Sequence, residues 1–169
     1  YKIKLIGDDS LSKRDFSRVI DPLQKFGATF YPKEKKTLPI YIKGTNFLRP
    51  IKFQDNIGSA QIKTSICLAA LNSPGQTIIK SKRCRDHTEK LFKFLKIPIK
   101  IKKEKNYDLI KITGLKNFKS FNYHIPADPS SSAFIVMLTI LSKNSSILIK
   151  NCLVNENRIG FYKILKLMG

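Results

Sequence analysis

The chain has 169 residues, enough to bury one good hydrophobic core or two small ones, and its 42% apolar content is ordinary for a globular protein. No stretch approaches 18 consecutive apolar residues, and the first residues are charged too early for a signal peptide, which excludes both kinds of segment. We therefore expect a soluble, cytoplasmic chain with no membrane partner. The widely spaced cysteines, Cys67, Cys84 and Cys152, predict reduced thiols, not a disulfide framework or a zinc site.

The net charge of +20, from 32 basic and 12 acidic side chains, is compatible with a nucleic-acid partner. Many lysines, however, alternate with aliphatic residues, as in Lys2-Ile3-Lys4 and Ile99-Lys100-Ile101-Lys102. Because successive side chains of a strand point to opposite faces, this pattern predicts lysines on the solvent side of sheets. We expect no functional binding of nucleic acid, and a basic nucleic-acid-binding module is kept as an alternative.

In chain order, the alternating residues 1–6 predict a strand. Residues 12–26 carry apolar side chains at the spacing of one helix face, and Gly27 is typical of a helix C-terminus. Strands are expected around residues 28–31 and 39–43. These elements precede a long apolar helix that begins near residue 60.

Four segments recur at a constant offset of 70 positions. The pairs are Pro39–Gly44 with Leu109–Gly114, Thr64–Leu71 with Phe134–Leu141, Thr77–Lys80 with Ile147–Lys150, and Leu91–Lys96 with Phe161–Lys166. In both copies the first helix is apolar nearly all round, whereas the strands alternate with lysine. We therefore predict an α/β, inside-out assembly of repeated βαβαββ units, with buried helices and solvent-facing sheets.

The repeat also predicts a partial chain. Gly169 falls at the position where Ile99 opens the closing strands of the preceding copy, and Tyr1 is not an initiator methionine. We expect a piece of a longer protein that is cut at both ends.

The stretch Gly58-Ser59-Ala60-Gln61 precedes the first apolar helix. It places a hydroxyl, small side chains and backbone N–H groups where the helix dipole favours an anion. An ordinary N-cap serine would give the same sequence, so both interpretations stay open here.

A second candidate lies in Cys84-Arg85-Asp86-His87-Thr88-Glu89. Asp86 and Glu89 have the spacing of a capping box, which predicts a structural task for both. Arg85 differs, because a cation at a helix N-terminus opposes the dipole, and a bound phosphate or carboxylate would give it a bidentate partner. Arg14 presents the same argument near the helix at 12–26, with an ordinary surface arginine as the alternative.

Two further features have structural explanations. Asp128 is expected to be a turn and cap residue before the second apolar helix. His87 and His124 have no second histidine or cysteine at ligand spacing, so we expect no metal site.

Four stretches of the chain resemble the EPSP synthase (3-phosphoshikimate 1-carboxyvinyltransferase) family of enolpyruvyl transferases, in the family's order. They are GDDSLSKRDFSRVIDPLQKFGA, GSAQIKTSICLAAL, CRDHTEKL and IPADPSSSAF, which are similar to the family's GD-x-SL-x-x-RP, SAQ-K, SRDHTE and PGD-x-SSAAF motifs. Two positions depart from those motifs, because Asp15 replaces a proline and Ala127 replaces a glycine.

The resemblance implies a shikimate-pathway enzyme of aromatic amino acid biosynthesis. Such an enzyme transfers the enolpyruvyl group of phosphoenolpyruvate to the 5-hydroxyl of shikimate 3-phosphate and releases phosphate. The family's reaction is an addition and elimination through a tetrahedral intermediate, without metal or organic cofactor. The implied partners are these two small-molecule substrates, and the full-length protein would be a monomer.

At the positions that match the family's motifs, the resemblance implies that shikimate 3-phosphate is bound by Ser59, Ala60, Gln61 and Arg85. Arg14 and Gln61 would bind phosphoenolpyruvate. We expect Ser59, Gln61, Arg85 and Arg14 to point into one concave surface. The family's catalytic residues are expected outside this segment, which by itself would be inactive.

The family layout implies that residues 1–125 belong to the first lobe and that 126–169 begin the second. A UDP-N-acetylglucosamine enolpyruvyl transferase is the alternative within the superfamily. A non-catalytic repeat scaffold, which would lack an anion site between Ser59 and Arg85, is a third possibility.

Overall fold

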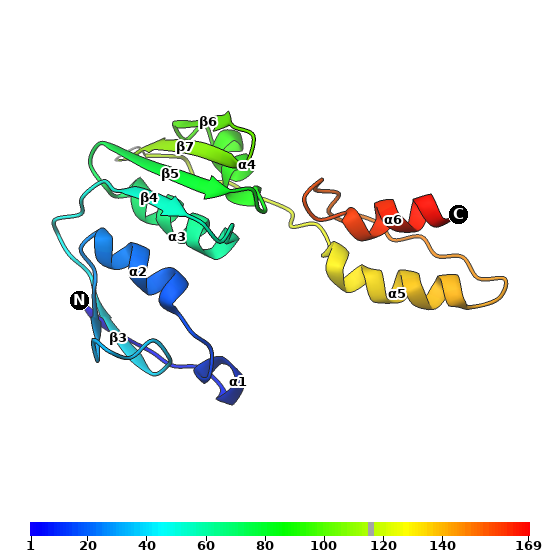
Figure 1. Cartoon of the computed structure of the whole chain (residues 1–169), viewed down its shortest axis with the longest axis horizontal. Coiled ribbons are helices and arrows are strands. Elements are labelled where there is room, and N and C mark those ends of the chain that lie inside the picture. The colour runs from blue at the N-terminus through cyan, green and yellow to red at the C-terminus, as the bar shows by residue number, and fades with distance from the viewer. Residues whose placement is uncertain (115–116) are drawn as a thin grey trace. The chain divides into compact units, whose positions relative to one another are not determined.

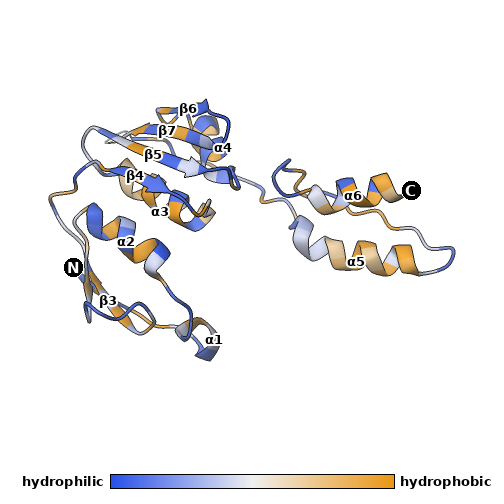
Figure 2. Ribbon diagram, in the orientation of Figure 1, coloured by the Kyte–Doolittle hydropathy of each residue, from blue (hydrophilic) through white to orange (hydrophobic). Residues whose placement is uncertain are grey.

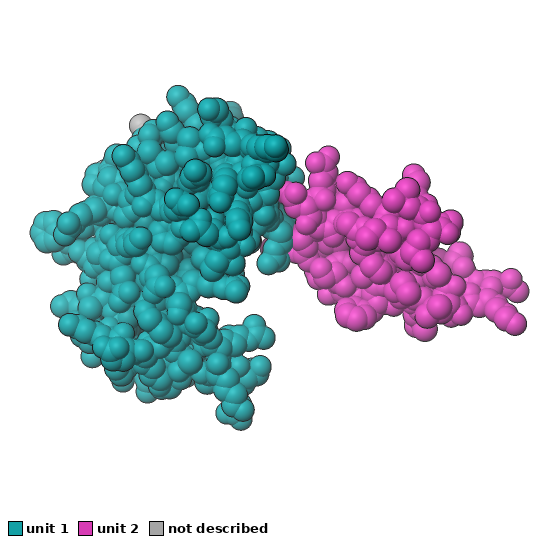
Figure 3. All heavy atoms as spheres, in the orientation of Figure 1, with its two compact units in different colours: residues 1–119 teal, residues 120–169 magenta. Residues whose placement is uncertain are grey.

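The computed structural model describes residues 1–114 and 117–169. The chain divides into two compact units, residues 1–119 and 120–169 (Figure 3). Among the described residues, no helix is long and apolar enough to cross a membrane.

The first compact unit contains a complete βαβαββ repeat between Lys52 and Thr113 (Figure 1). Its elements are β4 (Lys52–Asp55), α3 (Ala60–Leu71), β5 (Gln76–Lys82), α4 (His87–Phe94), β6 (Ile99–Lys103) and β7 (Tyr107–Thr113). The sheet has the order β4-β5-β7-β6, in which β4 and β5 are parallel and the other neighbours are antiparallel. The predicted repeat is confirmed.

An earlier part of the same compact unit has a second, smaller sheet. Its elements are β1 (Lys2–Leu5), α1 (Asp9–Ser12), α2 (Ser17–Lys25), β2 (Thr29–Tyr31) and β3 (Ile40–Lys43). The sheet order β1-β3-β2, antiparallel throughout, is the arrangement of β5-β7-β6. The starts of α2 and β2 precede those of α4 and β6 by 70 positions, so the repeat extends nearer to Tyr1 than the sequence comparison indicated.

The helix expected over residues 12–26 corresponds to α2, and only Ser12 of that range belongs to the separate short helix α1. The Asp8 carboxylate caps α1 by accepting a hydrogen bond from the backbone N–H of Leu11 at 2.6 Å. Asp15 accepts from the hydroxyl of Ser17 and, at 2.7 Å, from its backbone N–H, and these hydrogen bonds hold the pKa of Asp15 below its ordinary value. Such local bonds compete with a continuous helix, and so α2 begins only at Ser17.

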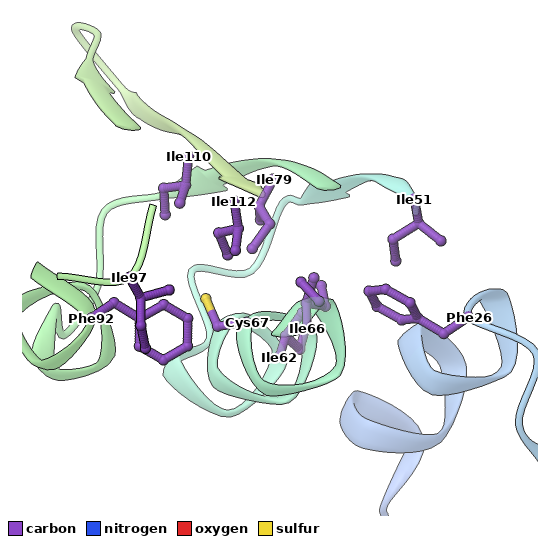
Figure 4. Close-up of a cluster of buried hydrophobic side chains, with 11 residues drawn as sticks. Phe26, Ile51, Ile62, Ile66, Cys67, Ile79, Phe92, Ile97, Ile110 and Ile112 are labelled. Carbon is purple, nitrogen blue, oxygen red and sulfur yellow. The ribbon is translucent and has the colours of Figure 1, made fainter. Parts of the chain in front are cut away.

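The hydrophobic core of the βαβαββ repeat lies between α3 and one face of the sheet (Figure 4). Side chains of α3, β5, β7 and the segments beside them meet there, including Ile62, Ile66, Cys67, Ile79, Phe92, Ile97, Ile110 and Ile112. Phe26 and Ile51 extend this core toward α2. Along β5, Thr77, Ile79 and Ser81 are buried whereas Gln76, Lys80 and Lys82 are exposed, as the lysine alternation predicts.

The second compact unit holds α5 (Pro129–Leu141) and α6 (Gly160–Met168). Residues 147–150 form no strand, contrary to the repeat, because a strand requires a hydrogen-bonded neighbour. The described residues of this unit offer only an isolated bridge between Ala127 and Cys152.

The two apolar helices differ in burial. Five residues of α3 are buried, whereas α5 buries only Pro129 and Ser132. The ribbon of α5 is coloured mostly as hydrophobic in Figure 2, and Phe134 and Leu141 are 80% and 77% exposed. The expected burial of the second apolar helix is therefore not seen, because no sheet covers it in the described residues of its unit.

The loop from β4 into α3 is fixed by one buried carboxylate. Asp55, which is 1% exposed, accepts backbone hydrogen bonds from Ile57 (3.0 Å), Gly58 (3.1 Å) and Ser59 (2.9 Å). It also accepts one from the Ser81 hydroxyl at 2.9 Å, which ties the loop to β5.

We predict that Asp55→Ala lowers the free energy of unfolding by about 3 kcal/mol, because it leaves buried donors without an acceptor. Chemical denaturation measures this loss. The control is Asp21→Ala, which removes an exposed ion pair with Lys36 (3.0 Å) and should cost less than about 1 kcal/mol. Equal losses in the two variants would contradict a special role for Asp55.

A glycine contrast within the repeat provides a second prediction. A Cβ atom at Gly114 would lie 2.0 Å from the carbonyl oxygen of Ser73 and 2.2 Å from that of Ala70. Gly44, at the matching position of the earlier copy, has no heavy atom within 4 Å of such a Cβ. We expect Gly114→Ala to cost at least about 1–3 kcal/mol, and Gly44→Ala to change stability by less than about 0.5 kcal/mol. Two similar melting temperatures would refute this contrast.

Candidate functional site

The described residues of the first compact unit enclose a surface pocket of about 570 Å³. Three helices contribute to its wall: α2 and α4 provide one residue each, α3 provides a whole face, and one further residue comes from the segment that precedes α4. The lining residues are Val19, Ala60, Gln61, Thr64, Ser65, Leu68, Arg85 and His87. Three of the expected site residues, Ala60, Gln61 and Arg85, are thus brought together.

The N-terminus of α3 forms one wall. Ser59 is the N-cap, and its hydroxyl oxygen accepts a hydrogen bond from the backbone N–H of Ile62 at 3.4 Å. Ser59 is only 7% exposed and is not among the lining residues, so the cap interpretation is confirmed. Ala60 and Gln61 occupy the first two helical positions, whose N–H groups have no acceptor within the helix.

Arg85 enters the pocket from the segment that precedes α4. Its side chain is exposed, and within residues 1–114 and 117–169 its guanidinium has no carboxylate partner. A guanidinium beside a helix N-terminus suits an anionic ligand, because it offers paired donors in a plane.

Arg14 lies apart from this group. It is exposed, sits between α1 and α2, and donates its backbone N–H to the carbonyl of Leu11 at 3.1 Å. It is not among the residues that line the pocket. The expectation that Arg14 shares one concave surface with Gln61 and Arg85 is not met by the pocket, and its role as a phosphoenolpyruvate ligand stays a prediction.

The capping box expected at α4 is not formed. Asp86 is the N-cap residue, but its side chain makes no capping hydrogen bond, and its Oδ2 lies 3.2 Å from Lys90 Nζ. Glu89 pairs instead with Lys63 of α3, at 2.5 Å between Oε1 and Nζ. A buried cation attracts the carboxylate more strongly than a backbone N–H does, which explains the difference.

The Lys63–Glu89 pair also influences the core beside it. Burial first, and then the negative charge of Glu89, raise the pKa of the Cys67 thiol to about 12. Cys67 is fully buried, so this thiol stays protonated at neutral pH and belongs to the core.

Sequence reasoning missed several lining residues that a helical pattern could have found. Thr64, Ser65 and Leu68 follow Gln61 at intervals of three, four and seven positions, the spacing of one helix face. His87 was considered only as a metal ligand. Among the described residues, no three His, Cys, Asp or Glu side chains gather to hold a metal ion.

The corresponding helix start in the second compact unit is closed by its own side chains. Asp128 caps α5 by accepting from the backbone N–H (3.1 Å) and hydroxyl (3.0 Å) of Ser131, as expected. Arg158 donates to Asp128 at 2.5 Å and to the Ser130 hydroxyl at 2.6 Å. Asn155, the counterpart of Arg85, is buried. Among the described residues, the arginine beside the start of α3 has no carboxylate partner, whereas the arginine beside the start of α5 is paired with Asp128.

Chemically, the pocket offers a guanidinium, an amide, two hydroxyls and an imidazole. These groups suit a small ligand that carries a phosphate and several hydroxyl groups. Among the described residues, the lining includes no carboxylate, and its one imidazole is that of His87.

Comparisons with known proteins show the family of the chain. The family model of EPSP synthase (3-phosphoshikimate 1-carboxyvinyltransferase) matches residues 1–169. A 3-phosphoshikimate 1-carboxyvinyltransferase of Petrotoga mobilis is 39% identical over 168 residues, which cover 98% of this chain and 38% of the relative. Its counterpart in Caldicellulosiruptor bescii is 39% identical over 167 residues, with the same two shares.

A solved structure of an EPSP synthase has a fold similar to that of this chain. EPSP synthase from Acinetobacter baumannii is 32% identical, with a TM-score of 0.81 over 100% of this chain and 38% of that one. The chain spans about 38% of the length of the curated relatives described above. Because the family model matches the chain from its first residue to its last, the chain belongs to the EPSP synthase family.

Proposed function

We propose that this chain forms part of an enzyme that transfers the enolpyruvyl group of phosphoenolpyruvate to the 5-hydroxyl of shikimate 3-phosphate and releases phosphate. The observation that carries the proposal is the pocket that joins Gln61 and Arg85, the two residues that distinguish this copy of the repeat. Membership of the family supplies the reaction.

In this proposal Arg85 holds the phosphate of shikimate 3-phosphate. The first N–H groups of α3, at Ala60 and Gln61, and the amide of Gln61 supply further donors. Ser59 accepts a hydrogen bond with its oxygen and keeps its own proton to donate. The helix dipole of α3 adds an attraction for the negative charge.

Phosphoenolpyruvate is proposed to contact Gln61, with Arg14 as a second ligand. The 5-hydroxyl adds to C2 of phosphoenolpyruvate and loses its proton while C3 gains one, which gives a tetrahedral intermediate. Loss of phosphate from C2 and of a proton from C3 then restores the double bond. Such chemistry requires donors that stabilise the phosphate leaving group, which guanidinium groups provide. Residues that move protons in this reaction are proposed to lie outside residues 1–169.

We further propose that residues 1–125 belong to the first lobe of the enzyme and 126–169 to the second. The working protein is proposed to be a cytoplasmic monomer that uses no cofactor.

Turnover can be tested in a chimera in which residues 1–169 replace the matching segment of the Petrotoga mobilis relative. We expect phosphate release that depends on both phosphoenolpyruvate and shikimate 3-phosphate. The unaltered relative is the positive control, and the chain alone should bind shikimate 3-phosphate weakly without turnover. A chimera that folds by circular dichroism and releases no phosphate would contradict the proposal.

Arg85→Ala in the chimera should weaken the binding of shikimate 3-phosphate by about 2–3 kcal/mol, because a charged hydrogen-bond partner is lost. This loss corresponds to roughly a 30- to 150-fold rise in the dissociation constant, which calorimetric titration resolves. The matched control is Arg83→Ala, since Arg83 lies two residues away and donates instead to the Glu104 carbonyl at 2.9 Å. Equal affinity in wild type and Arg85→Ala would refute the role of Arg85.

A further inference from the structure

Lys63 and Glu89 form a buried ion pair between α3 and α4. The distance from Lys63 Nζ to Glu89 Oε1 is 2.5 Å, and the two side chains are 2% and 4% exposed. Neither residue lines the pocket, yet each is close in sequence to one that does. Lys63 follows Gln61 by two positions, and Glu89 follows Arg85 by four.

The partner carboxylate favours the charged form of Lys63. Burial alone would lower the pKa of Lys63, but the hydrogen bond and the charge of Glu89 raise it above its ordinary value. A second contact joins the same two helices, because the hydroxyls of Thr64 and Thr88 lie 2.7 Å apart. The first turn of α4 is thereby held to α3 by two polar contacts beside each other.

A buried ion pair is weak evidence of a contribution to stability. Burying two charges is costly, and apolar residues of similar volume are often as stable. The second copy has no charge at these positions, because Ala133 and Ile159 stand 70 positions after Lys63 and Glu89. The charged pair occurs only in the copy whose helix start opens into the pocket.

The geometry of the pair is demanding. Glu89 makes the ion pair through Oε1, while Oε2 has no hydrogen-bond partner among the described residues. One short contact therefore carries the attraction. Apolar packing could slide by a fraction of an ångström, but this contact ties the two helix starts at a set separation.

We propose that Lys63 and Glu89 are positioning residues that hold Gln61 and Arg85 at the separation required by the phosphate-bearing substrate. This inference rests on the function proposed above. The pair acts through the two helices that carry those ligands and does not touch the substrate.

The test replaces both charges by apolar side chains of similar volume, Lys63→Met with Glu89→Leu, in the chimera. We expect a melting temperature within a few degrees of the unmodified chimera, because the buried charges are removed together. The KM for shikimate 3-phosphate should rise about tenfold or more, since small misplacements of binding groups are costly. The value of kcat should stay within about threefold.

The matched control is Lys90→Ala, which removes the exposed pair with Asp86 from the same helix and should leave KM unchanged. A pair without a positioning role predicts that the Lys63→Met and Glu89→Leu variant keeps its KM for shikimate 3-phosphate. That result would overturn the proposal.

Glu89→Asp keeps the test decisive if the apolar variant does not fold. It preserves the charge but shortens the side chain by one methylene group, so it should raise the KM for shikimate 3-phosphate at least about threefold. An unchanged KM in folded Glu89→Asp would also overturn the proposal. Turnover by the unmodified chimera separately tests the proposed function, so the two failures are distinguishable.

Discussion

The packing of α3 against the inner face of the four-stranded sheet is the constraint on which the rest of the first compact unit depends. Ile62, Ile66 and Cys67 meet Ile79 and Ile110 across this interface (Figure 4). Burial of these side chains stabilises the unit by roughly 1.5–3 kcal/mol for each large aliphatic residue. Because one long stripe of α3 is used for packing, only its N-terminus and its opposite face, which carries Gln61, Thr64 and Leu68, can meet a ligand.

Polar side chains of the fold bind the backbone N–H groups around the N-terminus of α3, except those that face the pocket. Asp55 occupies the backbone N–H groups of the preceding loop, and the Ser59 hydroxyl occupies that of Ile62. The donors of Ala60 and Gln61 are left at the pocket wall. An anion can be attracted there without leaving any of the loop's buried groups unsatisfied.

Comparison of the two copies of the repeat distinguishes residues that stabilise a helix start from residues that could bind a ligand. Both α3 and α5 begin with a capping side chain, so capping alone says nothing about a ligand. At α5, Arg158 reaches Asp128 and Ser130 and closes the helix start. At α3, Arg85 has no such acid to meet in the described chain, and the pocket opens beside it.

Local sequence determined the elements and the two polar candidates. The lysine alternation and the placement of Arg85 before a helix depend on residues that lie near one another in the chain. Together with the period of 70, which can be read without any structure, they predicted the βαβαββ repeat and a phosphate site. Tertiary structure decided what depends on distant partners. Glu89 was expected to cap its own helix, but Lys63, 26 positions away, attracts it instead. The strand expected at 147–150 did not form, because alternation makes a strand possible while only a hydrogen-bonded neighbour makes it stable.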